Sequence, residues 1–575
     1  MTAPAPVKNR LVQDPSLVWR LAEHETFGYA DGAEKYLEQV FRNAQDLGSC
    51  SEELESHIKD WPSEYHLSSK RAQLLSGFEF DRKARVLEVG AGCGAITRFL
   101  GERFDEVVAV EGSLQRARLA RLRTRDLPNV SILCAPFQKL EFTAPFDFIF
   151  CIGVYEYSAE FIEGPAPHDA ALRYFASMLK PDGMLVVAIE NQFGLKYFTS
   201  AREDHVGVMF EGVTGYHAAP GRVRTFGRNE LRTSLKKHFD TVEFFYPYPD
   251  YKIPDRVLSE EFLASARAGE LVSQSRSRDY GGPRTPLWEE SLAVLELARN
   301  GMLPLLANSF LVFAARSGMR GVSFDAEAVM FPPRPRGKFR SIARIEKSDS
   351  GGLVVTKRSA RGDSIDAGSV KWVATTSPWI DALSIATEVF GRCQRRGAAI
   401  ESIFEPCRPW ARFLESVSVE DQGIRYVGGE YLDCIWSNAY ARDGICEVVD
   451  LEWVWNERLR LNVVAIRACC LFLQRVGESQ FRSPALRQRS GRRLIEIIAS
   501  TLGLKFSDDD FSEFISIEAR LRNVVYGTPE RPTRRLLRWF LADRSSLDRY
   551  VSMRHLARRI ARSARVRLTR AIGRS

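Results

Sequence analysis

The fold of this chain is decided by residues 86–94, Val-Leu-Glu-Val-Gly-Ala-Gly-Cys-Gly. A short apolar strand leads into glycines 90, 92 and 94, and a helical pattern follows over 95–104. Glycine allows a tight backbone turn and a close approach of a ligand to the main chain. The stretch therefore predicts a strand, a ligand-binding turn and a helix in immediate succession.

Strands and helices alternate along the chain on the C-terminal side of this turn. Alternation of this kind predicts an α/β fold with a mostly parallel sheet that is covered on both faces. The segment 247–308, between the last two strands, is where we expect substrate-facing insertions. The expected strands are 85–89, 106–110, 130–134, 146–153, 184–189, 242–246 and 309–314.

A carboxylate at the end of the second strand complements the glycine turn. The glycines recur at every second residue, so the turn lacks the G-x-G-x-x-G spacing that brings amides onto a pyrophosphate. Glu111 stands 17 residues after Gly94. A carboxylate at this place can accept both hydroxyls of the ribose of a bound adenosine.

Four motifs in this order resemble those of the class I S-adenosyl-L-methionine-dependent methyltransferases. They are residues 86–94, Glu111, the fourth strand 146–153 and the late turn and fifth strand 179–185. The resemblance covers about residues 70–317 and implies a Rossmann-like seven-stranded methyltransferase sheet with S-adenosyl-L-methionine as cofactor.

The resemblance also implies which residues bind the cofactor. Glu88 and the glycine turn are expected at its methionine part, Glu111 at the ribose, and Ala135-Pro136-Phe137 beside the adenine. An acid often follows the third strand in this family, but Ala135-Pro136 stands there in this chain. The expected cofactor-binding residues are Glu88, Gly90, Ala91, Gly92, Cys93, Gly94, Glu111, Gly112, Ala135, Pro136, Phe137, Ile152 and Gly153.

Acidic and imidazole side chains follow the fifth strand, at the sheet edge where the acceptor is expected. Glu190 ends that strand, and Asp204 and His205 stand together further along. Methyl transfer to a hydroxyl requires positioning and a base. We predict His205 as the general base, with Asp204 or Glu190 as its orienting partner or substitute; a surface histidine is the alternative.

Three short runs are similar to methyltransferases of bacterial surface-polysaccharide synthesis. They lie at residues 191–198, 202–205 and 224–228. The similarity implies O-methylation of a saccharide or lipid-linked glycan. The aromatic run 244–251 could stack on sugar rings or pack beneath the insertion. A non-catalytic assembly protein and a small-metabolite methyltransferase are the alternative functions.

Basic charge is concentrated at the C-terminus. Residues 551–575 contain eight arginines and no lysine or acid, which accounts for the whole net charge of +8. The neutral remainder, without an N-P-P-Y or D-P-P-Y tetrapeptide, argues against a nucleic-acid partner. Residues 553–572 can form a basic amphipathic helix for an anionic membrane surface or a synthase, or a solvated tail. Without a signal peptide or apolar span, we expect a cytoplasmic protein, peripheral at the inner membrane if the tail binds lipid.

A second domain is expected over residues 320–500, with an α+β kinase-like outline. Lys357 ends a strand that resembles the one carrying a kinase's phosphate-binding lysine, and Glu388 is its expected partner. Asp433 and Asn438 have the D-x-x-x-x-N spacing of a kinase catalytic loop, and Asp450 stands where a metal-binding aspartate falls. The resemblance implies Mg²⁺ and ATP.

The kinase-like pattern departs from an active kinase at three places. Tyr431-Leu432 replaces the His-Arg before the catalytic aspartate, D-L-E-W at 450–453 replaces D-F-G, and no glycine-rich loop precedes the lysine. A scaffold and an unrelated α+β module are therefore alternatives. A methyltransferase followed by a kinase-like domain is the layout of bifunctional enzymes that cap O-antigen chains.

Residues 1–70 are expected as a helical N-terminal segment, 71–317 as the methyltransferase domain and 501–575 as a helical C-terminal region.

The ten cysteines show no C-x-x-C pair or other paired spacing. Several stand inside apolar runs, which is typical of buried free thiols in a reducing compartment. We therefore expect neither disulfides nor a zinc site, and apart from the Mg²⁺ that the kinase-like pattern implies we predict no metal ligands among the site residues.

Overall fold

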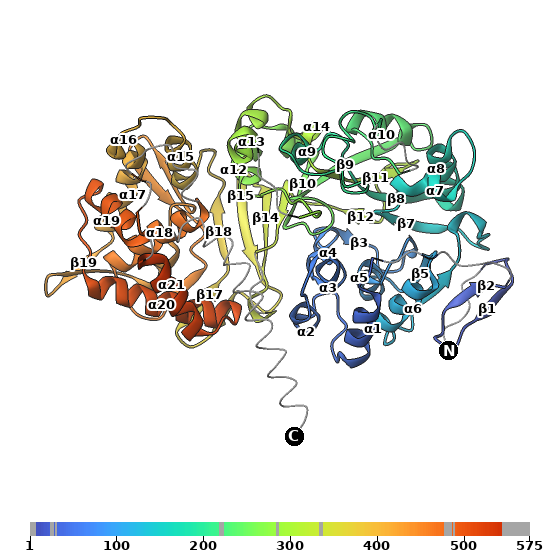
Figure 1. Cartoon of the computed structure of the whole chain (residues 1–575), viewed down its shortest axis with the longest axis horizontal. Helices are drawn as coiled ribbons and strands as arrows, with labels where there is room; N and C mark the ends of the chain where they lie inside the picture. The colour runs from blue at the N-terminus through green and yellow to red at the C-terminus, as the bar shows by residue number, and fades with distance from the viewer. Residues whose placement is uncertain are drawn as a thin grey trace, which may run out of the picture. The chain divides into compact units, whose positions relative to one another are not determined.

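The structure, a computed structural model, divides the chain into two compact units, residues 1–331 and 332–575 (Figure 1). Each unit has its own hydrophobic core. No helix in the described part of the chain is long and apolar enough to cross a membrane. The described residues are 7–22, 28, 31–217, 223–282, 287–332, 337–476, 486 and 489–542, so the predicted basic helix lies outside them.

Seven strands form the centre of the first unit's sheet, in the order β6-β5-β4-β7-β8-β11-β9. Strand β11 is antiparallel to both of its neighbours, and the other six run parallel. This arrangement confirms the predicted Rossmann-like sheet. The strands are β4 (Arg85–Val89), β5 (Glu106–Glu111), β6 (Val130–Cys134), β7 (Phe146–Ile152), β8 (Leu179–Glu190), β9 (Thr241–Tyr248) and β11 (Ser309–Ala315).

Short strands extend this sheet at both edges. Strands β2 (Trp19–Leu21) and β1 (Leu11–Gln13) continue it beyond β6, and β10 (Arg256–Ser259) and β13 (Ala328–Met330) continue it beyond β9. The first unit thus reaches residue 331, whereas the sequence pattern placed the division at 317–320. The N-terminal segment, expected to be helical, also contains the β1–β2 hairpin.

Helices cover both faces of the central strands (Figure 1). Residues 146–152 of β7 are at most 7% exposed, apart from Asp147, as expected for a strand buried on both faces. One layer contains α1 (Glu34–Asn43), α2 (Glu52–Ser56), α3 (Trp61–Leu67), α4 (Lys70–Gln73), α5 (Ala95–Arg103) and α6 (Leu114–Arg123). The other contains α7 (Ser158–Phe161), α8 (Pro167–Met178) and α10 (Arg228–Lys236).

The described part of the segment between β9 and β11 contains strand β10 and four helices. These helices are α11 (Glu260–Ala264), α12 (Ala268–Ser273), α13 (Glu290–Arg299) and α14 (Leu303–Leu306). Another short helix, α9 (Leu195–Phe198), lies earlier in the chain, directly after β8. A small pair of strands, β3 (Glu79–Phe80) and β12 (Val322–Ser323), lies outside the main sheet.

The second unit combines small antiparallel sheets with a group of helices. Strand β15 (Leu353–Arg358) pairs with β14 (Ile342–Lys347) and β18 (Thr375–Pro378). The other strands are β16 (Ser364–Asp366), β17 (Val370–Val373), β19 (Val419–Asp421), β20 (Ile424–Val427), β21 (Ala439–Arg442), β22 (Ile445–Val448), β23 (Trp453–Trp455) and β24 (Leu459–Arg460). The helices are α15 (Ile385–Cys393), α16 (Ile400–Phe404), α17 (Arg408–Ser416), α18 (Leu461–Arg475), α19 (Gly491–Thr501), α20 (Asp508–Tyr526) and α21 (Glu530–Ala542).

One core, from Val370 to Leu541, joins the helices of this unit to β17 and to β20 through β24. The described part of the region expected from residue 501 onward therefore packs into the second unit. Helix α20 has clear local signals: Ser507 and Asp510 form a capping box, and Gly527 ends the helix in the left-handed conformation. Nine of the ten cysteines are buried, and all have free thiols.

Candidate functional site

The glycine turn after β4 adopts a backbone that favours glycine. Gly90, Gly92 and Gly94 have φ angles of +79°, +55° and +84°. A Cβ atom at Gly90 would overlap Cγ2 of Val154, and one at Gly94 would lie 2.8 Å from Cα of Ala120. At Gly92 a Cβ atom would meet nothing within 4 Å. Packing therefore requires glycine at the first and third positions, while the middle position leaves an open face.

Glu111, at the end of β5, holds this turn in place. Its Oε2 accepts a hydrogen bond from the Gly92 amide at 2.7 Å, and its Oε1 accepts one from the Ser113 amide at 2.9 Å. Each carboxylate oxygen keeps further acceptor capacity. The structure thus brings together the turn and the acid that the sequence predicted as its partner.

Glu88 lies beneath the turn, with only 3% of its surface exposed. Its Oε2 atom is buried and has no hydrogen-bond partner. Burial, together with the nearby Glu111 carboxylate, raises the pKa of Glu88 to about 7. A buried acceptor without a donor is unfavourable. The amino group of an amino-acid ligand would satisfy it, so the residues present fit the methionine part of S-adenosyl-L-methionine.

The other predicted cofactor residues lie at the ends of β4 to β7, but they are not equally available. The Cys93 side chain packs in the core beside α1, which leaves its backbone to face the turn. The Phe137 ring stacks on Phe175 at 5.4 Å between centroids. A Cβ atom at Gly153 would lie 2.7 Å from Oη of Tyr251. Ile152 is the last residue of β7. The remaining residues of the set follow their strands closely: Ala91, Gly112, Ala135 and Pro136.

Six charged side chains meet beside the ends of β7, β8 and β9, and we call them the ionic cluster. Five are at most 7% exposed, and Lys252 is 13% exposed. Lys252 Nζ lies 2.5 Å from Glu190 Oε1, and Lys196 Nζ lies 2.5 Å from Asp204 Oδ2. His205 Nε2 lies 3.4 Å from Glu190 Oε2. The members of the cluster are Glu156, Glu190, Lys196, Asp204, His205 and Lys252.

The structure places the three predicted catalytic residues in this cluster with different partners. His205 faces Glu190, and its Nδ1 bonds to the Tyr157 hydroxyl at 2.9 Å. Asp204 instead pairs with Lys196 and accepts a hydrogen bond from the Tyr197 hydroxyl at 2.8 Å. Burial alone would lower the pKa of His205, but the Glu190 carboxylate has the larger effect and raises that pKa to about 9. His205 is therefore cationic at neutral pH in this arrangement.

Glu156 and Lys252 complete the cluster, although neither was among the predicted site residues. Glu156 is fully buried in the 3-10 helix η2 (Tyr155–Tyr157) after β7, and neither of its carboxylate oxygens has a hydrogen-bond partner. Lys252 follows β9. Parallel strands end at one edge of a sheet, which is the signal that could have found both residues.

Partly exposed aromatic rings lie beside the ionic cluster. Trp61, at the start of α3, stacks on Tyr280 at 3.9 Å between centroids and lies 5.6 Å from Tyr65. Lys252 Nζ lies 4.9 Å from the centre of the Tyr280 ring. The aromatic run on β9 is different, because residues 244–248 are buried in the sheet. Packing therefore explains those β9 rings.

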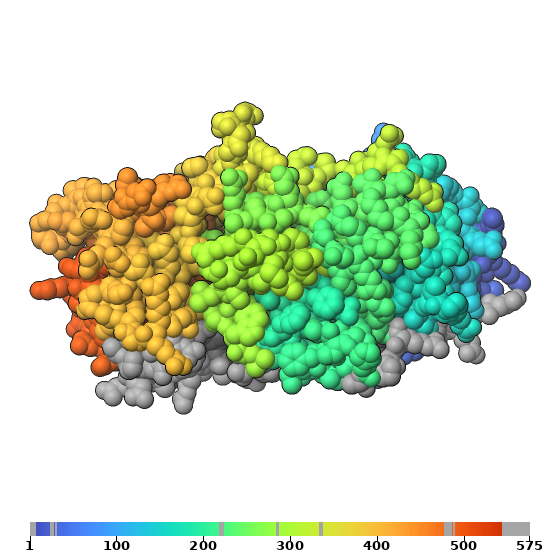
Figure 2. Space-filling model, turned by 90° about the horizontal axis from the view of Figure 1, so that it is seen from above, coloured from blue at the N-terminus to red at the C-terminus, as the bar shows by residue number. Residues whose placement is uncertain are grey.

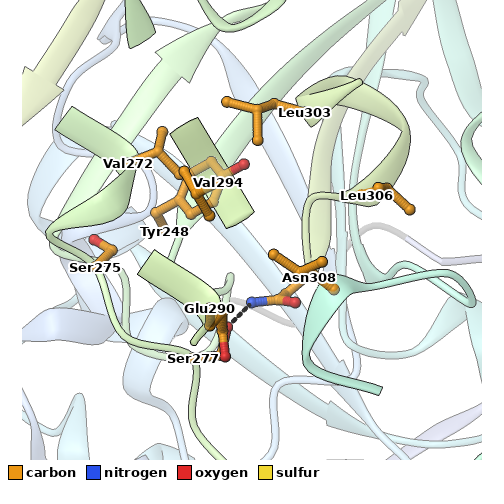
Figure 3. Close-up of a pocket in the computed structure, with 10 residues that line it drawn as sticks. Tyr248, Val272, Ser275, Ser277, Glu290, Val294, Leu303, Leu306 and Asn308 are labelled. Carbon is orange, nitrogen blue, oxygen red and sulfur yellow. Dashed lines mark hydrogen bonds between the residues drawn. The ribbon is translucent and has the colours of Figure 1, made fainter. Parts of the chain in front are cut away.

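The segment between β9 and β11 encloses a cavity whose volume is only about 10 Å³ (Figure 3). Such a volume is at most that of one water molecule. Asn308 Nδ2 donates a hydrogen bond to Ser277 Oγ at 2.8 Å across it. The cavity is a packing feature, too small for a sugar. The segment around residue 200, which carries part of the ionic cluster, reaches the surface of the first unit (Figure 2).

The second unit gathers the predicted kinase-like residues in a separate polar site. Lys357 pairs with Asp450 and, at 2.9 Å, with Glu452, so its partners differ from the expected Glu388. Asp450 has a φ of +62°, an uncommon backbone for a residue other than glycine. Sequence reasoning missed Glu452, which stands two residues after Asp450.

Asp433 and Asn438 lie next to each other in this site. Asn438 Nδ2 donates to the Asp433 carbonyl at 3.1 Å, and Arg467 pairs with the Asp433 carboxylate at 2.5 Å. Burial raises the pKa of Asp433, and the Asp450 carboxylate raises it further. The expected catalytic aspartate is therefore already held by an arginine.

Comparison with known proteins identifies the first unit's domain. Residues 87–187 match the family described as a methyltransferase domain. No curated protein matches the sequence. The family match and the strand order of the sheet together show that the chain contains a methyltransferase domain of Rossmann-like fold.

Solved structures with similarity to this chain are related at low identity. The N-methyltransferase NodS from Bradyrhizobium japonicum WM9, in complex with S-adenosyl-l-homocysteine, is 18% identical over 28% of this chain and 75% of its own, with a TM-score of 0.20. The [4+2]-cyclase SpnF is 17% identical over 45% and 84%, with a TM-score of 0.26. CalS10, an amino pentose methyltransferase from Micromonospora echinaspora with bound SAM, is 22% identical over 29% and 58%, with a TM-score of 0.18.

Proposed function

We propose that the first unit is an S-adenosyl-L-methionine-dependent methyltransferase that acts on a hydroxyl of a saccharide. The observation that carries the cofactor is the unpartnered Oε2 atom of Glu88 beneath a glycine turn held by Glu111. Glu88 would bind the amino group, the open face at Gly92 would admit the ligand, and Glu111 would accept the ribose hydroxyls. The cofactor supplies a methyl group on a sulfonium.

The ionic cluster is the proposed acceptor side of the site. It adjoins the cofactor residues through Tyr251, whose hydroxyl lies against Gly153 and donates to Glu190 Oε1 at 3.3 Å. A hydroxyl acceptor must lose a proton, and enzymes place imidazole and carboxylate groups for this purpose. His205, Glu190 and Asp204 remain the proposed residues for handling that proton.

The aromatic rings of Trp61, Tyr65 and Tyr280 support a saccharide acceptor. Their partly exposed faces beside the charged groups offer apolar surfaces next to polar partners, the pattern of a specific small-molecule site. A lipid-linked glycan of bacterial cell-surface polysaccharide synthesis is the proposed source of that saccharide. The arginine-rich residues 551–575 would then bind an anionic membrane surface or a partner synthase, which would hold a cytoplasmic protein at the inner membrane. No nucleic-acid substrate is proposed.

The test is transfer of a labelled methyl group from S-adenosyl-L-methionine to lipid-linked oligosaccharides. We expect label in the glycan with the unaltered protein and none with Glu111→Gln. Glu106→Gln is the matched control, because this exposed residue stands at the other end of β5. Cofactor binding without transfer to any glycan would favour the two alternatives, a non-catalytic assembly protein or a small-metabolite methyltransferase.

A second candidate function is phosphotransfer by the second unit. The observation that favours it is the pairing of Lys357 with Asp450, the two residues expected to hold nucleotide phosphates and Mg²⁺. The arginine on Asp433 favours a scaffold instead. Mg²⁺-dependent ATP binding that is lost in Asp450→Ala would support catalysis. If the unaltered protein does not bind ATP, the second unit is better explained as a non-catalytic recruiting domain.

A further inference from the structure

We propose that Glu156, Glu190 and His205 form a binding site for a divalent transition-metal ion. One ligand atom from each residue lies within 4.8 Å of the other two. The site itself rests on the geometry of these residues; only its role in methyl transfer rests on the proposed function.

The ligand atoms are unusual because all of them are buried without hydrogen-bond partners. This holds for both carboxylate oxygens of Glu156, for Oε2 of Glu190 and for Nε2 of His205. Buried polar atoms normally find partners, and a buried unpaired carboxylate is especially unfavourable. Glu156 is the strongest sign, because it is fully buried and nothing in the described structure compensates its charge at hydrogen-bond distance. A cation between the three side chains would satisfy all of these atoms at once.

The spacing suits a metal ion better than a direct ion pair. His205 Nε2 and Glu190 Oε2 lie 3.4 Å apart. Two ligands of a tetrahedral ion, each about 2.1 Å from it, are separated by about 3.4 Å. The ligand atoms of all three residues lie within 4.8 Å of one another, so each pair would have to approach by at most about 1.4 Å to reach that separation.

Neighbouring residues already orient the three ligands. The Tyr157 hydroxyl bonds to His205 Nδ1 at 2.9 Å. A bound ion would replace the proton on Nε2, and with the remaining proton on Nδ1 the Nε2 lone pair would face the carboxylates. Lys252 and Tyr251 both bind the other oxygen of Glu190, which leaves Oε2 free. Metal-binding histidines and carboxylates are usually fixed by such outer contacts.

One imidazole and two carboxylates favour Mn²⁺ or Zn²⁺ over Ca²⁺, which takes oxygen ligands alone. Glu156 and Glu190 would offset the charge of the ion, and Asp204 neutralises Lys196. Lys252, which contacts Glu190, would remain as one further positive charge.

Three protein ligands leave positions for a water molecule or an acceptor hydroxyl. A bound cation lowers the pKa of such a hydroxyl. With the ion in place, His205 and Glu190 would act as its ligands, and the proton would pass to solvent instead of to them.

The test is calorimetric titration of the chelator-treated full chain with Mn²⁺ and with Zn²⁺, without S-adenosyl-L-methionine. We expect one ion per chain and affinities at least about tenfold weaker for Glu156→Gln and His205→Gln. Glu88→Gln is the matched control, since it changes another buried, unpartnered carboxyl outside this group, and it should bind the ion as the unaltered protein does. Failure of the unaltered protein to bind either ion, or equal binding by all variants, would overturn the proposal.

A second readout separates loss of a ligand from loss of folding. Co²⁺ in the site should give visible absorption bands whose pattern changes in His205→Gln, while circular dichroism of the variant stays that of the unaltered protein. Metal binding without methyl transfer would refute only the proposed reaction. Methyl transfer by a protein that binds no metal would refute only this site.

Discussion

Replacing Gly90 by alanine should destabilise the first unit by about 2–5 kcal/mol. The residue has a φ of +79°, and a left-handed backbone costs an alanine about 1–2 kcal/mol. The new Cβ atom would also overlap Cγ2 of Val154, and forcing an extra methyl into packed surroundings costs about 1–3 kcal/mol. Gly92→Ala is the matched variant, because its Cβ atom meets nothing within 4 Å and only the backbone cost of about 1–2 kcal/mol remains.

Hydrogen exchange of the amides in β4 and β7 measures the local free energy of opening. In a double-mutant cycle, Val154→Ala should recover the steric part of the Gly90→Ala loss, about 1–3 kcal/mol, and leave the backbone part. Gly92→Ala should fold well yet bind S-adenosylhomocysteine poorly, because its methyl group fills the open face. A Gly90→Ala protein within about 0.5 kcal/mol of the unaltered one, or no recovery in the double variant, would refute this account of the turn.

Three further predictions concern buried charges. Burial alone would raise the pKa of Glu518, but Arg522 and Arg467 outweigh it and hold that pKa at about 2, below its ordinary 4.5. The ionised Glu518 therefore stabilises the folded second unit fully above pH 4.5, and this contribution is lost as the pH falls toward 2. Glu518→Gln should therefore flatten the pH dependence of the second unit's unfolding midpoint in that range. Arg467→Met should cost the second unit about 3–5 kcal/mol in hydrogen exchange, because Asp433 stays buried without its arginine and Glu518 keeps only Arg522. With a Glu88 pKa of about 7, affinity for S-adenosylhomocysteine, measured by calorimetry, should rise as the pH increases through 7, and Glu88→Gln should remove that rise.

The central sheet and the glycine turn could be predicted because their signals are local. Each strand of the seven is an apolar run, and the turn carries its own glycines followed by Glu111. The end of the first unit could not be predicted in this way. Strands β12 and β13 are two and three residues long, and they exist because partners elsewhere in the first unit pair with them.

The candidate site was predicted in part for the same reason. Glu190, Asp204 and His205 could be named because they stand near the end of a predicted strand. Their partners come from distant segments: Lys252 meets Glu190 from a position 62 residues further along the chain. Which charge pairs with which depends on tertiary packing, so neither the role of Glu156 nor the pairing of Asp204 with Lys196 could be read from sequence spacing.

The most direct test of the cofactor assignment is calorimetric titration of the full chain with S-adenosylhomocysteine. The account predicts one binding site per chain, with affinity reduced at least about tenfold in Glu111→Ala, because the carboxylate that would bind the ribose hydroxyls is removed. Circular dichroism would show whether the variant keeps the fold. Affinity unchanged in a folded Glu111→Ala protein, or no binding by the unaltered chain, would contradict the assignment.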